Sequence, residues 1–304
     1  MKCLVVGLGI QGQKRKKIAG RDVVATVDPV VAAADYRRIE DVPLERYEAA
    51  LCCVPDHPKP DLLNFLLRNG KHVLVEKPLL CGSRKELEEL VSLSEQNGVA
   101  CYTAYNHRFE PHLVTIRKIL ASGEVGRVYQ ANFFYGNGTA RDVRNSPWRD
   151  RDLGVISDLG SHLLDWTLFL FGKPAGDPEL WSCLRCENLA PDHAKFAFRG
   201  APSLEYEASL LSWRNTFRLD LWAEKGSLHV DGLCKWGPSR LTVRNRVLPS
   251  GRPQERVQTM EKPDPTWEAE YQHFRGLCRQ PSHNLANDIW IQEMLGSLRG
   301  QMKL

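Results

Sequence analysis

The fold of the first part of the chain is decided by residues 1–12, which read Met1-Lys2-Cys3-Leu4-Val5-Val6-Gly7-Leu8-Gly9-Ile10-Gln11-Gly12. The apolar run Cys3–Val6 predicts a buried β-strand, and the segment after it predicts a helix. Glycines spaced as Gly-x-Gly-x-x-Gly are informative between a strand and a helix, because they allow a tight turn and a close approach of the backbone to a pyrophosphate. The N-terminus of the helix then offers free N–H groups to that anion. Gly7–Gly12 is therefore a candidate dinucleotide site.

Short apolar runs and longer amphipathic runs continue to alternate through the first hundred residues. Further strands are expected at Val23–Val27, Ala49–Val54, His72–Val75 and Val99–Thr103, and helices at Gln11–Ala19, Lys59–Asn69 and Ser83–Asn97. Such a repetition of strand and helix is typical of βαβ units around a parallel sheet. We expect a doubly wound α/β domain.

Asp28 ends the second expected strand, sixteen positions after Gly12. A carboxylate at this place can accept hydrogen bonds from the adenosine ribose hydroxyls, and its charge would repel a 2′-phosphate. NAD is therefore the expected cofactor, with NADP as the alternative. The basic run Lys14–Lys17 either attracts the pyrophosphate or is a solvated helix face, and we favour the solvated face.

After Arg108 the pattern changes to that of an α+β domain. The helices expected there are Pro111–Ala121, one near Asp158–Phe171, Thr266–Arg279 and Leu285–Leu298, the last packing back on one of the two domains. The expected strands are Arg127–Tyr135, Leu180–Cys186, Lys195–Phe198, Leu204–Trp213, Phe217–Ala223, Ser227–Val230 and Arg240–Val247. Their alternation predicts an open, mainly antiparallel sheet with one covered face. We place the two domains at residues 1–108 and 109–304.

The composition sets limits on the class of protein. The 304 residues are 42% hydrophobic and 26% charged, which is typical of globular chains and excludes wholesale disorder. The net charge of +4 is too weak to drive nucleic-acid binding, so a small-molecule partner is expected. With neither an apolar run of about 18 residues nor a signal-peptide layout, we expect a cytoplasmic protein with no membrane partner. The nine cysteines are expected to be reduced thiols.

Two further motifs carry residues suited to proton and charge transfer. Glu76-Lys77-Pro78 follows the fourth expected strand, at the carboxyl edge of the sheet where ligands of doubly wound folds bind. Asp158 and His162 stand four residues apart, hence on one face of a helix. The ordinary pKa of histidine, about 6.5, suits a general base near neutral pH. An ammonium such as that of Lys77 would stabilise the charge of a developing alkoxide.

Five motifs, in this order and spacing, resemble the glucose-fructose oxidoreductase / inositol dehydrogenase family (Gfo/Idh/MocA): Gly7–Gly12, Asp28, Glu76-Lys77-Pro78, Asn106-His107-Arg108-Phe109 and Asp158–Asp165. The resemblance covers about residues 1–110 and 145–170, while 175–304 agree only in layout. It implies a Rossmann domain, an open sheet whose exposed face makes homodimer or homotetramer contacts, and an active site between the domains. It also implies hydride transfer between a nicotinamide cofactor and a carbinol of a sugar, cyclitol or nucleotide-linked sugar.

The resemblance also implies roles for individual residues. Lys77, Asp158 and His162 would be catalytic, with His162 as the general acid/base and Asp158 as its partner or as a ligand of a substrate hydroxyl. Asp165 would be a capping or supporting partner. Besides Gly7–Gly12 and Asp28, the positions assigned to the cofactor are Cys53, Val54, Pro55, Glu76, Lys77 and Asn106. Asn106 would also close over the substrate.

Two departures from the family pattern concern the pocket. Relatives commonly carry a histidine where this chain has Lys59, and we assign no role to Lys59 or to His57. The glycine run that often precedes the Asp158/His162 helix is reduced to Gly154, so the shape of the substrate pocket is left open.

The loop before Asp158 is a candidate substrate loop. It contains Trp148 and the arginines Arg141, Arg144, Arg149 and Arg151. These residues either form a solvated basic loop, or they bind a carboxylate or diphosphate and stack on a sugar face. The second reading names Trp148 and Arg149 as substrate residues and favours an anionic or nucleotide-linked sugar.

Cys183-Leu184-Arg185-Cys186 has the spacing of a zinc half-site, but no second pair follows, so no metal is expected. Two alternatives to the sugar dehydrogenase stay open. One is an imine or enone reductase on the same fold, and the other is a non-catalytic dinucleotide-binding sensor. The presence of Lys77, Asp158 and His162 argues against the sensor.

Overall fold

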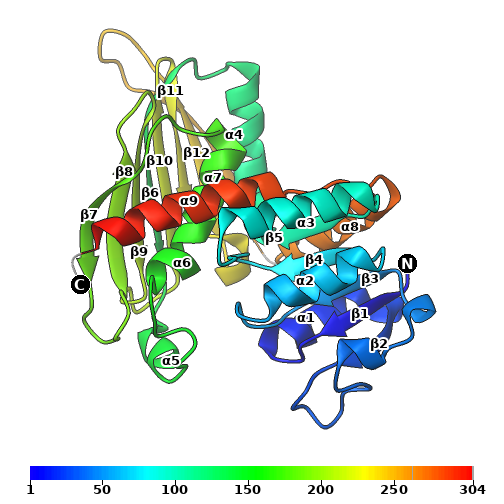
Figure 1. Ribbon diagram of the computed structural model, residues 1–304. Coiled ribbons are helices and arrows are strands. Elements are labelled where there is room, and N and C mark those ends of the chain that lie inside the picture. The colour runs from blue at the N-terminus through cyan, green and yellow to red at the C-terminus, as the bar shows by residue number, and fades with distance from the viewer. Residues whose placement is uncertain (262, 303–304) are drawn as a thin grey trace. The chain divides into compact units, whose positions relative to one another are not determined.

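The computed structural model describes residues 1–261 and 263–302 (Figure 1). The chain divides into two compact units. The first unit takes in Met1–Asn106 together with Trp267–Glu293. The second contains His107–Thr266 and the chain from Met294 onward. Each unit holds one β-sheet.

The first unit is built on a five-stranded parallel sheet in the order β2-β1-β3-β4-β5. The strands are β1 (Cys3–Val6), β2 (Val23–Val27), β3 (Ala49–Cys52), β4 (His72–Glu76) and β5 (Cys101–Ala104). The winding reverses between β1 and β3, and ligands of such sheets bind at this switch point, outside the carboxyl ends of the strands. The doubly wound sheet expected from the sequence is confirmed.

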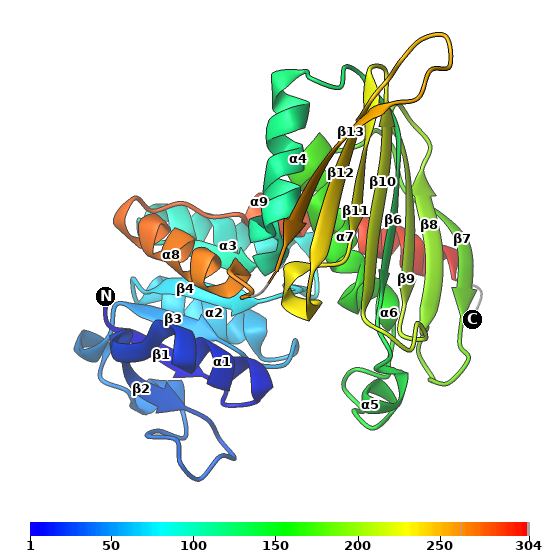
Figure 2. The same cartoon turned by 180° about the vertical axis from the view of Figure 1, so that it is seen from behind.

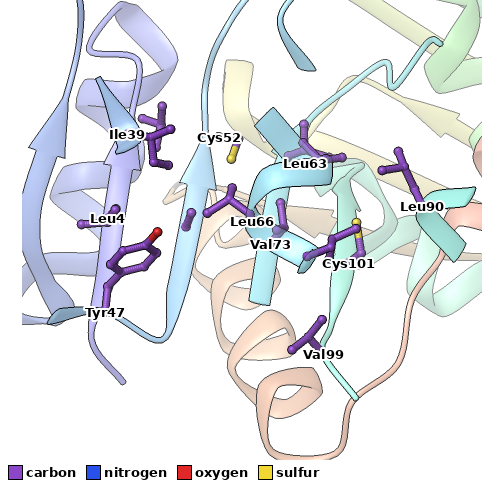
Figure 3. Close-up of a cluster of buried hydrophobic side chains, with 14 of the residues drawn as sticks. Leu4, Ile39, Tyr47, Cys52, Leu63, Leu66, Val73, Leu90, Val99 and Cys101 are labelled. Atoms are coloured by element: carbon purple, nitrogen blue, oxygen red, sulfur yellow. The ribbon is translucent and has the colours of Figure 1, made fainter. Parts of the chain in front are cut away.

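Helices cover both faces of this sheet. The main ones are α1 (Ile10–Ala19), α2 (Lys59–Arg68), α3 (Arg84–Gln96) and α8 (Thr266–Arg279). Figure 3 shows Leu63 and Leu66 of α2 beside Val73 of β4, all fully buried. A second core cluster on the other face contains Phe274 of α8. Each fully buried Leu or Phe contributes about 1.5–3 kcal/mol, so both faces of the sheet are stabilised by apolar burial.

The second unit is built on an eight-stranded sheet in the order β13-β12-β11-β10-β6-β9-β8-β7 (Figure 2). The strands are β6 (Val128–Gly136), β7 (Glu179–Leu184), β8 (His193–Phe198), β9 (Ser203–Ser209), β10 (Thr216–Ala223), β11 (Gly226–Asp231), β12 (Ser239–Asn245) and β13 (Gln254–Met260). Only the pairing of β6 with β9 is parallel among these described strands. The expected mainly antiparallel sheet is confirmed.

One face of this sheet is apolar and the other polar. Along β10, Phe217, Leu219 and Leu221 are buried, whereas Arg218 and Trp222, which alternate with the buried residues, are exposed. The helices of this unit begin with α4 (Pro111–Ser122), α5 (Ala140–Arg144), α6 (Val155–Asp158) and α7 (Gly160–Phe171). The last helix, α9 (Leu285–Gln301), starts in the first unit and ends in the second. Short 3₁₀ turns are η1 (Gly20–Asp22), η2 (Ile39–Asp41), η3 (Leu44–Arg46), η4 (Asn106–Phe109) and η5 (Cys234–Trp236).

The structure differs from the sequence-based expectations at several elements. The helix expected near Asp158–Phe171 is present as α7, but Asp158 is the last residue of α6. The expectation that Asp158 and His162 share one face of one helix is therefore wrong. The strand expected at Leu204–Trp213 ends at Ser209. β13 was not expected, because its side chains are almost all exposed and show no apolar alternation. Within residues 1–261 and 263–302, no helix is long and apolar enough to cross a membrane.

Candidate active site

The glycines of Gly7–Gly12 form a cradle at the carboxyl end of β1. Gly7 has a φ of +88°, and a Cβ placed on it would lie 2.4 Å from the carbonyl oxygen of Cys53. A Cβ on Gly12 would lie 1.8 Å from the carbonyl oxygen of Gly7. Both positions therefore require glycine. At Gly9 a Cβ would meet open space. The backbone is therefore tightly packed at Gly7 and Gly12, whereas the space beside Gly9 is clear for a ligand.

Asp28 lies beside this loop, where its carboxylate is 8% exposed. It accepts the backbone N–H of Leu8 at 2.7 Å, of Val30 at 2.9 Å and of Val31 at 2.8 Å. Burial raises the pKa of Asp28, but these three N–H groups, together with the charge of Arg37, hold the pKa below its ordinary value. A carboxylate has about four acceptor positions, so one remains for a ribose hydroxyl.

The remaining cofactor-loop residues lie at the same sheet edge. The N–H of Cys53 donates to the carbonyl of Val6 at 2.7 Å, which extends the pairing of β3 with β1 and brings Cys53-Val54-Pro55 alongside the glycine loop. Ile10, at the start of α1, is 88% exposed. The clear space at Gly9, the first N–H groups of α1 and the spare acceptor of Asp28 fit a dinucleotide.

Lys77 follows β4 and lies between two residues that are held by buried cations. On one side, Glu76 accepts from Nε of Arg15 at 2.7 Å. Arg15 is 1% exposed and also pairs with Glu270, which is fully buried, at 2.7 Å. The guanidinium lies 4.2 Å from the centre of the Trp267 ring. The carboxylate before Lys77 is thereby fixed to both α1 and α8.

On the other side, Lys59 holds the carbonyl that follows Lys77. Its Nζ donates to the backbone oxygen of Pro78 and to Asp56, at 2.7 Å in both cases. Lys59 is 1% exposed, and burial lowers the pKa of its ammonium while Asp56 opposes that shift.

The expectation that Lys14–Lys17 form a solvated helix face is wrong at Arg15, which is 1% exposed. The anchoring of Glu76 by Arg15 and of Pro78 by Lys59 was not predicted from the sequence. A signal existed, because each follows the buried face of its helix. Lys59 precedes the buried Leu63 and Leu66 at helical spacing, and Arg15 stands between the buried Gly12 and Ala19.

The second unit places His162 in the first turn of α7, 6% exposed and among aromatic rings. Its ring centre lies 4.6 Å from that of His107, 5.8 Å from that of Tyr135 and 6.2 Å from that of Trp166. Low solvent exposure of an imidazole keeps bulk water from competing for its proton.

Lys235 of η5 contacts two of the residues whose rings surround His162, namely His107 and Tyr135. Its Nζ lies 3.1 Å from Nε2 of His107 and 3.1 Å from the hydroxyl of Tyr135. The sequence offered no pattern that marks Lys235, which lies in a turn between two strands of the second unit.

Asp158 and Asp165 have different surroundings. Asp158, at the end of α6, accepts from Arg149 at 3.0 Å, and both side chains are about one-third exposed. Asp165 is 1% exposed and binds Arg108 of η4 with hydrogen bonds of 2.7 and 2.9 Å. Burial raises the pKa of Asp165, and Arg108 opposes that rise. Asp165 therefore holds η4 to α7.

The candidate substrate loop is only partly exposed. Trp148 of this loop is 50% exposed. Asn106, the other candidate substrate residue, lies outside the loop at the start of η4 and is 8% exposed. Arg149 donates to Asp158, so this ion pair connects the arginine loop to the end of α6. Cys183 and Cys186 are free thiols, and the described residues contain no group of three or more His, Cys, Asp or Glu side chains suited to a metal.

Two family models match the chain. One is described as an oxidoreductase family with an NAD-binding Rossmann fold and matches residues 1–105, and the other is the GFO/IDH/MocA C-terminal domain and matches residues 113–229. The chain belongs to the Gfo/Idh/MocA oxidoreductase family. Residues 1–105 match the NAD-binding Rossmann domain of this family, so the family and the type of cofactor expected from the sequence are confirmed.

Individual relatives match the chain over part of its length or at low sequence identity. The scyllo-inositol 2-dehydrogenase (NADP(+)) IolW of Bacillus subtilis (strain 168) is 32% identical over 113 residues, which are 36% of this chain and 30% of that protein. The chain thus matches about a third of that relative's length. A putative NADPH-dependent oxidoreductase from Desulfitobacterium hafniense has a TM-score of 0.84 at 15% identity, with 99% of this chain and 95% of that chain covered. The UDP-N-acetylglucosamine 3-dehydrogenase GnnA from Acidithiobacillus ferrooxidans has a TM-score of 0.81 at 17% identity, covering 99% and 97%. At these identities the structures share the fold.

Proposed function

We propose that this protein is an NAD(P)-dependent dehydrogenase that acts on a CH–OH group of a sugar, a cyclitol or a nucleotide-linked sugar. The observation that carries the proposal is the combination found at one sheet edge of the first unit. There a glycine cradle open at Gly9 and the carboxylate of Asp28 lie at the switch point, and Lys77 follows a neighbouring strand between two anchored residues. This edge suits a dinucleotide with an ammonium near its reactive end.

The chain's own residues supply the proton and charge steps. When bound, the nicotinamide cofactor accepts a hydride from the carbinol carbon or returns it to the carbonyl. In the oxidation, His162 removes the hydroxyl proton as the C–H electron pair leaves, and the O–H electron pair becomes the second bond of the carbonyl. Lys77 stabilises the negative charge that develops on that oxygen. In the reverse direction His162 returns the proton.

Asp158 has a supporting part in this scheme. Its carboxylate pairs with Arg149 at 3.0 Å and remains one-third exposed, so it is able to accept a hydrogen bond from a substrate hydroxyl. Trp148 and Arg149 then line the substrate side, and Asn106 closes over the nicotinamide. The cyclitol and nucleotide-sugar activities named for two of the relatives are consistent with this class of substrate.

Cofactor choice is proposed to favour NAD. Asp28 carries a negative charge beside the glycine loop, where a 2′-phosphate of NADP would face it. One relative is named for NADP, so both cofactors belong in the assay.

The test is a turnover screen of NAD and NADP against free sugars, cyclitols and nucleotide-linked sugars, followed by nicotinamide absorbance. Activity on at least one class is expected, with a loss of about 10²-fold or more in His162→Ala. Activity confined to nucleotide-linked sugars would support the arginine loop as a diphosphate site. If His162→Ala keeps most of its turnover, an imine or enone reductase becomes the better assignment. If fluorescence titration finds no binding of NADH or NADPH, the proposal is wrong.

A further inference from the structure

Lys235, His107 and Tyr135 come from three elements of the second unit, η5, η4 and β6, and meet at one point. Nζ of Lys235 lies 3.1 Å from Nε2 of His107 and 3.1 Å from the hydroxyl oxygen of Tyr135. The imidazole nitrogen and the hydroxyl are themselves 3.2 Å apart. Each pair of the three atoms is within hydrogen-bonding distance.

The chemistry of the three groups decides where the protons lie. An ammonium has three N–H donors and no acceptor. Nε2 of His107 therefore faces Lys235 as an acceptor, which requires the neutral imidazole with its proton on Nδ1. The oxygen of Tyr135 also accepts from Lys235 and keeps its own proton to donate. The triangle thus specifies the charge and the tautomer of His107, which an imidazole near neutral pH does not fix by itself.

The state of His107 matters because its ring packs on that of His162. The ring centres are 4.6 Å apart and the ring planes make an angle of 51°. The two side chains are only 2% and 6% exposed. Two imidazolium ions at this separation repel each other, so the pair takes up one proton well before the second. Without a further constraint, either ring is able to hold that proton.

The position of Lys235 is itself anchored by the residue before it. Cys234 donates its backbone N–H to Oε1 of Glu110 at 3.2 Å, and its thiol lies 3.0 Å from Oε2. Glu110 is fully buried before the first turn of α4. The ammonium also lies 4.5 Å from the centre of the Trp236 ring and 5.5 Å from that of Tyr135, distances at which aromatic faces attract a cation.

We propose that Lys235 is a positioning residue for the acid/base step: by donating to His107 it keeps that imidazole neutral, and it leaves His162 as the ring that takes and returns the substrate's proton. This inference rests on the proposed function, which makes His162 the acid/base group. Tyr135 of β6 faces His107, and the elements that carry the two imidazoles, η4 and α7, are joined by the Arg108–Asp165 ion pair. Asp158, which pairs with Arg149, ends α6 four residues before His162.

The test is long-range ¹H–¹⁵N NMR of the full-length protein labelled with ¹⁵N-histidine, recorded against pH without cofactor or substrate. The resonances are assigned with His107→Asn and His162→Asn. In the wild-type protein, His107 is expected to keep its proton on Nδ1 and to stay neutral while His162 titrates. In Lys235→Met, the titration midpoint of His107 is expected to rise by at least about one pH unit relative to the wild-type protein. The neutral form of His107 is also expected to lose its preference for the tautomer with the proton on Nδ1. Lys118→Met, which removes an exposed lysine of α4, is the matched control and leaves both rings unchanged.

Two more variants keep the proposal falsifiable if Lys235→Met is poorly folded. Lys235→Arg retains a cationic donor and is expected to keep the wild-type tautomer, and Tyr135→Phe keeps the ammonium and is expected to do the same. A wild-type His107 that is protonated near pH 7, or that carries its proton on Nε2, would overturn the proposal. So would a Lys235→Met protein whose His107 titration is unchanged. Because this readout needs no substrate, it remains decisive if the turnover screen fails.

Once a substrate is known, turnover adds a second readout. Lys235→Met is expected to lower kcat roughly tenfold, with the acidic limb of the pH profile moved to higher pH and the KM for the cofactor unchanged. Lys235→Arg is expected to restore the limb. A fall in kcat without any movement of the limb would point to a merely structural part for Lys235.

Discussion

The carboxylate of Asp28 accepts backbone N–H groups of the fold, and its charge is proposed to disfavour the 2′-phosphate of NADP. A single substitution tests both effects. Asp28→Asn keeps the shape of the side chain but removes its charge and places an amide near the N–H of Leu8. Because a buried donor then lacks an acceptor, we expect the free energy of unfolding to fall by about 1–3 kcal/mol. Removal of the negative charge is expected to move the NADPH-to-NADH ratio of dissociation constants about tenfold toward NADPH. Fluorescence titration with both cofactors measures the ratio, and an unchanged ratio would contradict the assignment.

The same carboxylate makes a pH-dependent contribution to stability. The pKa of Asp28 is lowered in the folded state, since three backbone N–H groups and the charge of Arg37 together outweigh the effect of burial. Its ordinary unfolded pKa is about 3.9, so the contribution is fully present above that pH and is lost as the pH falls through the folded value. The difference in unfolding free energy between the wild-type protein and Asp28→Asn should therefore shrink below about pH 4. Urea unfolding at several pH values measures it, and a constant difference would rule the effect out.

Lys59 tests whether the carbonyl of Pro78 must be held for Lys77 to work. Lys59→Met removes the donor to that carbonyl, while Asp56, one-third exposed, remains accessible to water. We expect stability to change by no more than about 1–2 kcal/mol and kcat to fall roughly tenfold, with NADH affinity unchanged. Lys85→Met, which removes a lysine 84% exposed on α3, is the control for loss of one charge. Equal kcat in the two variants would show that Lys59 does not position Lys77.

At the scale of elements, one ion pair joins η4 to α7. Arg108 approaches Asp165 with hydrogen bonds of 2.7 and 2.9 Å, and Asp165 is almost completely buried. Arg108→Met leaves a buried carboxylate without its cation, so we expect a loss of about 3–5 kcal/mol at pH 7. Differential scanning calorimetry of both proteins measures the loss.

The sign of the pH dependence provides the check on this prediction. Burial raises the pKa of Asp165 and Arg108 opposes it, so removal of Arg108 raises that pKa further. The variant's loss should therefore shrink as the pH falls and Asp165 takes up a proton. The double variant Arg108→Met/Asp165→Asn, which has no buried anion, should recover much of the stability. A loss that is the same at pH 5 and pH 8 would argue against this account.

Elements also show where a sequence pattern is reliable. The N-cap of α3 is one case, because Ser83, the first residue of the helix expected at Ser83–Asn97, accepts the N–H of Glu86. β13 is the opposite case, since nearly all its residues are exposed and only pairing with β12 makes it a strand. Backbone pairing between neighbouring strands leaves no mark in a polar sequence. The boundary between α6 and α7 at Leu159 could not be predicted from the sequence either, because the helical spacing of residues continues across it.

For the whole molecule, the polar face of the eight-stranded sheet is the proposed contact between copies of this chain. Trp222 on that face is 36% exposed, and its ring lies 5.9 Å from that of His229. We expect a homodimer or homotetramer by analytical ultracentrifugation, and we expect Trp222→Glu to lower the assembly state by placing a charge in the interface. Trp213→Glu, at a tryptophan 84% exposed outside the strands, is the control. A wild-type protein that sediments as a monomer would refute the proposal.

The sequence by itself determined the parallel sheet, the mainly antiparallel sheet and the glycine cradle. These depend on the period of apolar residues and on glycine spacing, which act over a few residues and can be read locally. It also named Lys77, Asp158 and His162 as candidate catalytic residues, through motifs in a recognisable order, and their roles stay predictions. Only the tertiary structure decided what surrounds them. Glu76 meets Arg15 from 61 residues away, and His107 meets Lys235 from 128 residues away. Such contacts depend on how distant elements fold together, and no local pattern encodes which buried charge will meet which partner.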